Sequence, residues 1–426
     1  MWTRIDRNLN VPPSVRMVLN TLYDGGFEAY LVGGCVRDFL LQREVKDYDI
    51  ATSAKPDEVQ RLFPKTVETG KAFGVIKVIT EDHREHEVAT FRKDGPYGDH
   101  RRPSRVEFGD VQADGARRDF TINALYFDLK TNRVLDLFGG IEDLRDKVIR
   151  AIGDPDARFR EDALRLLRAV RFSSRFHFTI EEQTRVAILK KAPLIRKISM
   201  ERVRDELEKM ITHASARAAI KELDDLGLLE NVMPEISVAK LGQRKVWDQT
   251  LRVLSVLGKY HPVEPKAFYW GLFLLPALRL LPIEKRDAEV RKIAARLKLS
   301  SDCTGQMAYL VRETPKFRDA FSMREATLLR WMKDPDFELL VRFHGLDAIS
   351  YDGNLAGLEF VRAIYPEAKR RLEMKPLVTG DDLVRLGLTP GPKFTEILRT
   401  IEDLALEGTL TTPEEALNHV LTHFVV

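Results

Sequence analysis

The chain has 426 residues, 44% of them hydrophobic and 31% charged, a composition typical of a folded protein long enough for two or more domains. No apolar run is long enough to cross a bilayer and the N-terminal segment lacks an apolar signal stretch, so we expect a cytoplasmic protein without membrane association. The 68 basic and 65 acidic residues nearly balance, and the two cysteines, Cys35 and Cys303, exclude a disulfide framework and a cysteine metal site.

A glycine turn near the N-terminus separates a short apolar run from a helical pattern. Residues 30–32 predict a buried strand, Gly33 and Gly34 break it, and residues 36–42 have helical spacing. Backbone N–H groups at a helix start bind phosphate oxygens, and glycine lets the backbone approach such a ligand closely. With Arg37 adding a guanidinium in the first helical turn, the segment predicts a triphosphate site.

Two carboxylates follow the turn. Asp47 and Asp49 would share one face of a strand, about 7 Å apart at the Cα atoms, with Tyr48 pointing the other way into packing. Both could then ligate the same pair of Mg²⁺ ions, about 3.5–4 Å apart, which is an arrangement for phosphoryl transfer. A glycine turn or an Asp-x-Asp triplet alone is weak evidence, but their order and spacing here favour a catalytic site.

Further strands are predicted at residues 74–80, 86–91 and 121–127, whereas helical periodicity dominates beyond residue 152. The pattern therefore predicts an α+β head followed by a long all-helical part. Glu87, in the second of these strands, is either a third carboxylate near the metals or a salt-bridge partner.

Two basic segments flank the last strand of the head. Residues 92–103 form a charged loop with glycine and proline, either a solvated loop or a lid that contacts nucleotide or primer. Arg117, Arg118 and Asp119 precede the strand at 121–127. They are surface charges unless that strand joins the sheet of Asp47 and Asp49, in which case Arg118 could hold triphosphate oxygens and Asp119 a ribose hydroxyl.

Residues 158–172 predict an amphipathic helix. Its polar side carries Asp162, Arg165, Arg168 and Arg171, and its apolar side packs. The alternative without a ligand is that this polar side is a solvent-exposed face on which neighbouring side chains form ion pairs. Because local acids are too few to pair with all the arginines, we favour an anionic ligand.

Asp162 and Arg165 suggest how a base would be chosen. Cytosine and adenine present an amino donor beside a ring-nitrogen acceptor, which a carboxylate and a guanidinium complement. Uracil and guanine present the opposite pattern, so this pair would admit CTP and ATP and reject UTP and GTP.

These residues together resemble the class II tRNA nucleotidyltransferases, a family that includes CCA-adding enzymes and bacterial poly(A) polymerases. The similar segments are the turn at 33–38 with Asp47 and Asp49, the motif at 117–119, a hinge-like segment at 136–144, the base template at 161–165, a neck helix at 201–207 and tail motifs at 378–380 and 388–392.

The resemblance implies a polymerase-β-like nucleotidyltransferase head with a mixed sheet at residues 1–146, a helical neck with the base pocket at 147–212, a helical body at 213–330 and a tRNA-binding tail at 331–426. It implies Mg²⁺-dependent addition of CMP and AMP to a tRNA 3′ end without a nucleic-acid template. Asp47 and Asp49 would bind the metal ions. The nucleotide would be held by Gly34, Arg37, Arg118, Asp119, Asp162, Arg165, Arg168 and Arg171.

The alternatives are an A-adding enzyme, a poly(A) polymerase and, more remotely, a noncatalytic RNA-binding protein of the same fold. The segment 92–103 argues against a CC-only enzyme, because in this family such a loop is needed for the switch to ATP. The chain has no His-Asp dipeptide, so the phosphohydrolase activity of some relatives is not expected. No protein partner is predicted.

Overall fold

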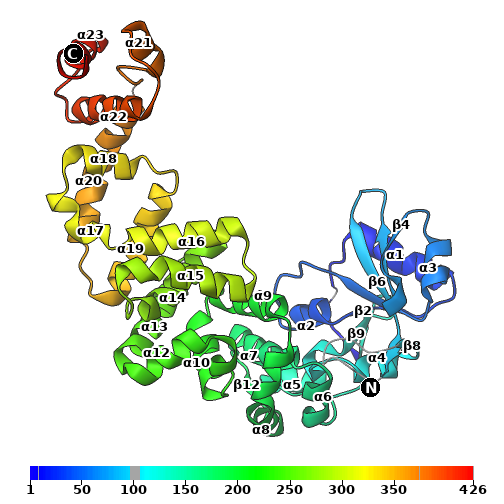
Figure 1. Ribbon diagram of the computed structural model, residues 1–426. Coiled ribbons are helices and arrows are strands. Elements are labelled where there is room, and N and C mark those ends of the chain that lie inside the picture. The colour runs from blue at the N-terminus through cyan, green and yellow to red at the C-terminus, as the bar shows by residue number, and fades with distance from the viewer. Residues whose placement is uncertain (8, 96–105, 374, 426) are drawn as a thin grey trace. The chain divides into compact units, whose positions relative to one another are not determined.

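The computed structural model describes residues 1–7, 9–95, 106–373 and 375–425. The chain divides into two compact units, Met1–Gly242 and Gln243–Val426, and each is described by itself (Figure 1). Within the described ranges, no helix combines the length and apolar character needed to cross a membrane.

The first unit begins with a mixed sheet, as predicted. Its order within the described residues is β1 (Trp2–Arg4), β10 (Arg133–Asp136), β9 (Leu125–Asp128), β2 (Ala29–Val32), β3 (Asp49–Thr52), β6 (Glu85–Thr90), β5 (Val75–Ile79) and β4 (Thr66–Gly70). Neighbouring strands are antiparallel except β3 and β6, which are parallel. Two short pairs lie outside this sheet, namely β7 (Arg92–Asp94) with β8 (Val106–Phe108) and β11 (Val148–Ile149) with β12 (Thr179–Ile180).

Both faces of the sheet are packed. Tyr30 and Val32 belong to a buried cluster with Phe91 and Tyr126 on one face. On the other face Phe127 contacts the ring of Phe39, with ring centroids 5.7 Å apart. Helices α1 (Pro13–Asp24), α2 (Gly34–Leu40) and α3 (Pro56–Leu62) pack against strands of the sheet. Helix α2 ends earlier than the predicted 36–42 segment because Gln42 has a left-handed φ of 58°.

Helices make up most of the rest of the first unit. They are α4 (Val111–Ala116), α5 (Gly140–Asp146), α6 (Pro155–Glu161), α7 (Leu164–Phe176), α8 (Glu182–Lys191), α9 (Met200–Ile211), α10 (Ala216–Asp225), α11 (Leu229–Val232) and α12 (Pro234–Gly242). Short 3-10 turns occupy Lys71–Phe73, Thr121–Asn123 and Ala192–Lys197.

Two further predicted elements, a helix and a strand, differ from the structure. The single helix at 158–172 is wrong, because the chain is extended at Asp162 (φ −139°, ψ 101°) between α6 and α7. Its carboxylate accepts the Leu164 N–H at 3.1 Å, a local bond that competes with the helix. The strand at 121–127 begins only at Leu125, because residues 121–123 form a 3-10 turn whose Thr121 hydroxyl donates to Asp143.

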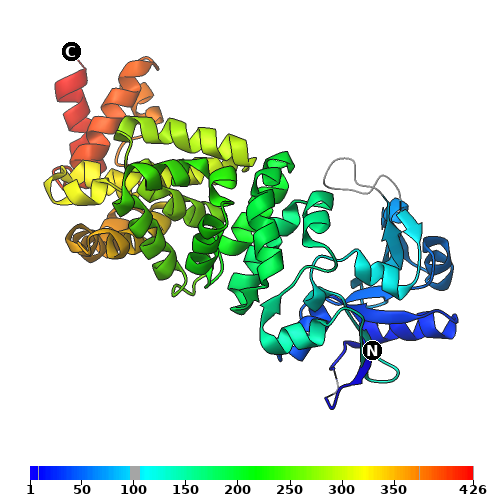
Figure 2. The same ribbon diagram turned by 90° about the horizontal axis from the view of Figure 1, so that it is seen from below.

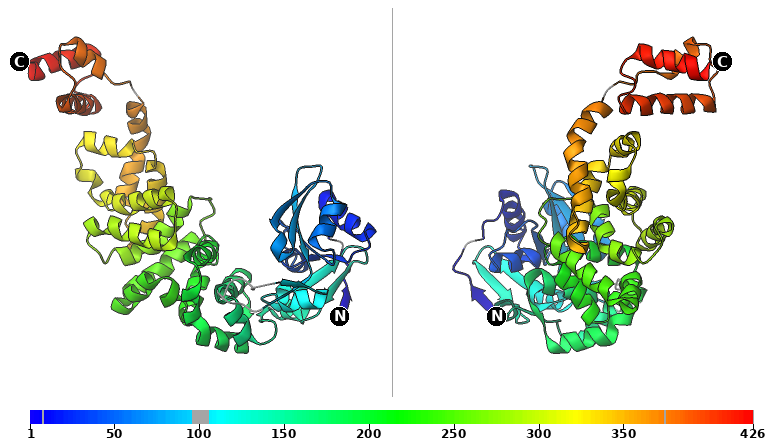
Figure 3. Two further views of the ribbon diagram at one scale, coloured as in Figure 1. Left: turned by 45° about the vertical axis from the view of Figure 1, so that its right-hand side comes forward. Right: turned by 90° about the vertical axis from the view of Figure 1, so that its left-hand side faces the viewer.

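The described part of the second unit is helical, in agreement with the prediction (Figures 2 and 3). Its helices are α13 (Arg244–Leu257), α14 (Lys266–Leu278), α15 (Ile283–Leu297), α16 (Ser301–Glu313), α17 (Lys316–Asp319), α18 (Glu325–Met332), α19 (Phe337–Tyr351), α20 (Ala356–Leu372), α21 (Gly380–Arg385), α22 (Pro392–Leu406) and α23 (Pro413–Phe424), with a 3-10 turn at Ala320–Ser322. The apolar helix α14 packs against α13, α16 and α19. Leu383, Ile397 and Val420 form a separate core among α21, α22 and α23. The finer boundaries at 146, 212 and 330 stay predictions.

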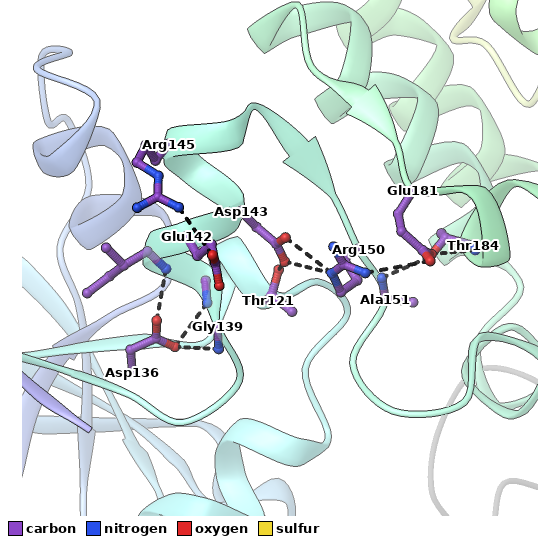
Figure 4. A network of polar contacts seen from close by, with 12 residues as sticks. Thr121, Asp136, Gly139, Glu142, Asp143, Arg145, Arg150, Ala151, Glu181 and Thr184 are labelled. Carbon is purple, nitrogen blue, oxygen red and sulfur yellow. Dashed lines mark hydrogen bonds and ion pairs between the residues drawn. The ribbon is translucent and has the colours of Figure 1, made fainter.

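A polar network links the end of the sheet to the helices that follow it (Figure 4). Asp136 Oδ1 accepts the N–H groups of Phe138, Gly139 and Gly140 at 3.1, 2.9 and 3.0 Å, and Oδ2 accepts that of Ile141 at 2.9 Å. In α5, Asp143 accepts bonds from the Thr121 hydroxyl at 2.6 Å and from Arg150 at 3.1 Å. Arg150 also lies 3.6 Å from Glu181. The hinge-like segment is thus anchored by carboxylates at both of its ends.

Replacing Asp136 by Ala is expected to lower the free energy of unfolding by about 2 kcal/mol, because four N–H groups at the start of α5 lose their acceptor. Denaturant unfolding of the purified protein measures this loss. Arg145→Gln is the control: this side chain of α5 is 71% exposed and bonds Glu142 and Asp146 at the surface, so the change should stay within about 0.5 kcal/mol. Equal stability of the two variants would contradict the capping role of Asp136.

Candidate active site

The glycine turn and Asp49 meet at one edge of the sheet. Strand β2 pairs with β3 so that Val32 is opposite Asp49, and Gly33 follows directly with φ of 74°, a conformation that favours glycine. The Gly33 N–H donates to the Leu125 carbonyl at 3.2 Å, which fixes the turn to the start of β9. The strand pairing therefore places the glycine turn beside Asp49.

Three carboxylates gather at this edge. The parallel register of β3 and β6 pairs Ile50 with Val88, so the preceding residues, Asp49 and Glu87, are neighbours. Burial raises the pKa of Asp49, and the charges of Glu87 and Asp47 raise it further, whereas Arg118 lowers it. A carboxylate repelled by two others is a suitable ligand for a cation.

Asp47 occupies a different position from the predicted one. Strand β3 begins at Asp49, so Asp47 and Tyr48 precede it, and the prediction that both aspartates lie on one strand is wrong. The reason is that β2 ends at Val32, the partner of Asp49, and offers no residue with which Asp47 could pair. Tyr48 is half-buried and donates to the Asn10 carbonyl at 3.2 Å.

Two guanidinium groups flank the glycine turn. A side-chain carbon on Gly33 would lie 3.4 Å from Arg118 Nη1, and one on Gly34 would lie 3.6 Å from Arg37 Nη2. Arg118 is held by the carboxylate of Asp114 at 3.0 Å and by the hydroxyl of Tyr126 at 3.2 Å. The absence of side chains on the turn thus leaves its backbone open beside two cations.

A chain of hydrogen bonds leads from α2 to α7. Arg37 is 5% exposed and donates to Asn123 Oδ1 at 2.6 Å, and Asn123 in turn donates to Asp119 Oδ1 at 3.0 Å. The other oxygen of Asp119 accepts from Arg168 Nε at 2.7 Å. Burial alone would raise the pKa of Asp119, but Arg168 and Asn123 outweigh it and lower this pKa to about 2.

Each of the three arginines predicted to line the polar side of the helix at 158–172 has an acidic partner. Arg165 lies 2.8 Å from Glu161, Arg168 pairs with Asp119, and Arg171 Nε donates to Glu206 Oε2 at 2.6 Å. The local acids are too few, as predicted, but the inference that these arginines therefore lack acidic partners is wrong, because Asp119 and Glu206 come from segments distant in sequence.

The structure does not join the side chains of Asp162 and Arg165. Asp162 instead accepts two bonds from Arg202, at 3.2 and 2.8 Å, while Arg165 binds Glu161 and donates to the carbonyls of Arg158 and Arg117 at 3.0 and 2.7 Å. A cavity of about 380 Å³ is lined by Arg117, Arg158 and Glu161, which contact Arg165 or lie next to Asp162 in the chain, but neither Asp162 nor Arg165 lines it.

Several residues of the site were not found from the sequence. Asp114 could have been found, because it lies three and four residues before Arg117 and Arg118 and binds both. Asn123, Arg202 and Glu206 give no such local signal, since their partners are remote. Of the predicted loop at 92–103, Arg92–Asp94 form β7, and residues 96–103 lie outside the described part of the chain.

Comparisons with known proteins show to which families the chain is similar. Residues 29–150 match the family described as the poly A polymerase head domain, and residues 177–240 match the family described as the probable RNA and SrmB-binding site of polymerase A. The CCA-adding enzyme of Lactobacillus helveticus is 34% identical, with 98% of each chain covered. That of Limosilactobacillus reuteri is 39% identical, with 92% of each covered. A crystal structure of the Bacillus stearothermophilus CCA-adding enzyme in complex with CTP has a TM-score of 0.77, with 26% identity, and covers 97% of this chain and 99% of its own.

A mixed sheet with a glycine turn and an acidic edge, followed by helices with an RNA-binding match, defines a nucleotidyltransferase of the poly(A) polymerase head type. Within that class, the full-length similarity at 34% identity is decisive. The chain belongs to the family of CCA-adding enzymes, which are tRNA nucleotidyltransferases.

Proposed function

We propose that this chain completes the 3′ end of tRNA by transferring CMP from CTP and AMP from ATP, with release of pyrophosphate. The observation that carries the proposal is the register of β2 and β3, which sets the glycine turn beside Asp49 in a chain that aligns with CCA-adding enzymes over nearly its whole length. The neighbouring families of A-adding enzymes and poly(A) polymerases use the same chemistry, but the full-length relatives above are CCA-adding enzymes.

The acidic edge suits Mg²⁺. In the described residues, no set of three or more His, Cys, Asp or Glu side chains is placed to hold an ion by itself. Mg²⁺ is commonly bound through one or two carboxylates together with substrate phosphates, so Asp47 and Asp49 would hold it once a nucleotide is present. Glu87 would become a third ligand only if it moved toward that ion. The metal, when bound, lowers the pKa of the attacking 3′ hydroxyl and stabilises the leaving pyrophosphate.

The chain's own groups position the nucleotide. Gly34, Arg37 and Arg118 would hold the triphosphate, since the turn backbone is open beside both guanidinium groups. Asp119, kept ionised by Arg168, would accept a bond from a ribose hydroxyl. Arg168 and Arg171 support the wall of the base pocket through their ion pairs with Asp119 and Glu206.

Base selection would require an exchange of partners. Asp162 would release Arg202, and Arg165 would release Glu161, so that the carboxylate and the guanidinium both face the base. Cytosine or adenine replaces the lost bonds, whereas uracil or guanine leaves buried polar groups unpaired.

The proposed function is tested with transcripts of one tRNA ending before CCA, after C and after CC, each supplied with CTP, ATP or both. CCA addition gives stepwise growth that stops after the terminal A. Failure to incorporate CTP on any transcript would overturn the proposal. In that case a single added A would indicate an A-adding enzyme, unlimited ATP incorporation a poly(A) polymerase, and no incorporation a noncatalytic protein.

Arg165→Ala is expected to raise the kcat/KM for UTP and GTP relative to CTP and ATP by about tenfold, because the donor to the ring nitrogen is lost. Single-nucleotide incorporation on the same transcripts measures the ratio. Arg160→Ala is the matched control, since this α6 side chain is 59% exposed and lies 3.9 Å from Asp156 at the surface. Unchanged selectivity in the Arg165 variant would reject its role in the template.

A further inference from the structure

The second unit contains a cavity with a concentration of positive charge. The cavity, of about 440 Å³, opens among α14, α15, α17, α19 and the start of α20, which are labelled in Figure 1. Its wall carries Arg279 just after α14, Arg286 in α15 and Arg318 in α17. Guanidinium groups from three separate helical segments therefore converge on one space.

The acids of the cavity do not balance these arginines. Asp347 pairs with Arg279, and Asp352 lies 3.8 Å from Arg318. Arg286 forms no ion pair in the described part of the chain, although the charge of Glu284 acts on it, and its Nε donates to the Leu281 carbonyl at 3.1 Å. Burial and the charges of Arg279 and Arg318 lower the pKa of Arg286, which shows that the three guanidinium groups repel one another. An anion placed among them would relieve that repulsion.

A buried imidazole in the same wall has an unused polar atom. His344 is 8% exposed and its ring stacks on Phe317 with centroids 4.0 Å apart. Its Nδ1 is buried and finds no hydrogen-bond partner among the described residues. Buried polar atoms are rarely left without a hydrogen-bond partner. A ligand bound in the cavity would supply that partner to His344 Nδ1.

The donors match a phosphate group. A carboxylate offers two oxygens, whereas a phosphate offers three or four, enough for several guanidinium forks. At the rim, Tyr351 is 41% exposed and Arg279 lies over its ring, 4.1 Å from the centroid. An exposed aromatic ring of this kind can stack with a base attached to the phosphate.

We propose that this cavity is a phosphate-binding site of the helical unit, separate from the nucleotidyl-transfer machinery. The phosphate comes either from RNA or from a free phosphate compound, and both sources present the same oxygens to Arg279, Arg286 and Arg318. None of these residues takes part in the proposed transfer reaction.

The test compares Arg286→Gln with Arg291→Gln in the full chain. Both residues lie on α15, but Arg291 is 55% exposed and pairs with Asp287, away from the cavity lining. In the first arm, inorganic phosphate is titrated calorimetrically without Mg²⁺. We expect Arg286→Gln to weaken phosphate affinity about tenfold, the usual effect of losing a charged hydrogen bond, and Arg291→Gln to match the wild type.

In the second arm, tRNA affinity is measured against salt concentration. If the source is RNA, Arg286→Gln weakens tRNA binding and reduces the slope of log K against log salt by about 0.7–0.9. If only the phosphate arm responds, the source is a free phosphate compound. Wild-type affinities of Arg286→Gln for both probes would overturn the proposal.

Two further measurements separate a failure of the phosphate-site proposal from misfolding of a variant and from failure of the proposed function. Arg318→Gln replaces a side chain that is 63% exposed, so it tests the cavity even if Arg286→Gln fails to fold. CCA addition by the wild-type protein is assayed on the same preparations. Its absence would overturn the proposed function and leave the phosphate result standing.

Discussion

Asp49→Asn is expected to lower nucleotidyl transfer at least about a thousandfold while tRNA affinity stays within about twofold. In the proposed mechanism this carboxylate ligates the ion that stabilises the transition state, an effect of several kcal/mol, and each 1.36 kcal/mol corresponds to a factor of ten in rate. Single-turnover incorporation of one nucleotide measures the loss. Glu85→Gln is the matched control, because this exposed residue of β6 bonds Lys77 at 2.8 Å and lies two positions from Glu87.

Asp49→Asn is expected to raise the stability of the protein although it lowers its activity. The pKa of Asp49 is raised by burial and by Glu87 and Asp47, so the ionised form is less favourable in the folded protein than in the unfolded chain. The stability of the wild type therefore falls as pH rises through that raised pKa. At neutral pH without Mg²⁺, Asp49→Asn should unfold at a higher temperature than the wild type.

Adding Mg²⁺ and CTP reverses this order if Asp49 holds the metal. A ligand that binds only the folded state raises the unfolding temperature, so the wild type and Glu85→Gln gain stability and Asp49→Asn gains less. An equal Mg²⁺-dependent gain in Asp49→Asn would refute the metal role, whatever its activity. Glu87→Gln, measured in the same way, decides whether the third carboxylate takes part.

Features that depend on residues close together in the sequence could be predicted from it, whereas contacts between residues distant in the sequence could not. The turn at Gly33 and Gly34, the strand before it and the all-helical second half are local patterns of glycine and apolar spacing, and all are present in the structure. The break at Asp162 was missed because one side-chain bond to Leu164 competes with a helix that periodicity favours. Neither Asp162 nor Ala163 interrupts the pattern of the sequence.

The partners of the arginines could not be predicted for a different reason. Arg168 meets Asp119 across 49 residues and Arg171 meets Glu206 across 35, and pairs so distant leave no periodic signal. Counting acids within the helix therefore overestimated the free positive charge. By contrast, the site at the edge of the sheet could be predicted from the sequence, because the motif residues themselves lie at the ends of the paired strands.

The second large effect is expected at Asp119. Asp119→Ala should lower the free energy of unfolding by about 3–5 kcal/mol, because Arg168 and Asn123 lose a buried partner. Denaturant unfolding at neutral pH gives the value. Asp146→Asn is the control, since this carboxylate is 51% exposed and pairs with Arg145 at the surface, where a change within about 0.5 kcal/mol is expected.

A double-mutant cycle separates the ion pair from general damage. Asp119→Ala and Arg168→Gln together should cost less than the sum of the single changes, since removal of both partners leaves no unpaired buried charge. Additive losses would show that the two side chains act independently.

The pH dependence of this loss follows from the depressed pKa of Asp119, about 2 in the folded protein against an ordinary value of 3.8. A carboxylate whose folded pKa is lowered contributes stability above its unfolded pKa and loses it as pH falls through the folded value. The difference in stability between the wild type and Asp119→Ala should therefore be constant from neutral pH down to about 5 and shrink toward pH 2. Since Arg37, Asn123, Asp119 and Arg168 form one chain of bonds, the same titration would loosen the contact between α2 and α7. A stability difference that persists unchanged at pH 2 would mean that packing, not charge, maintains the contact between α2 and α7.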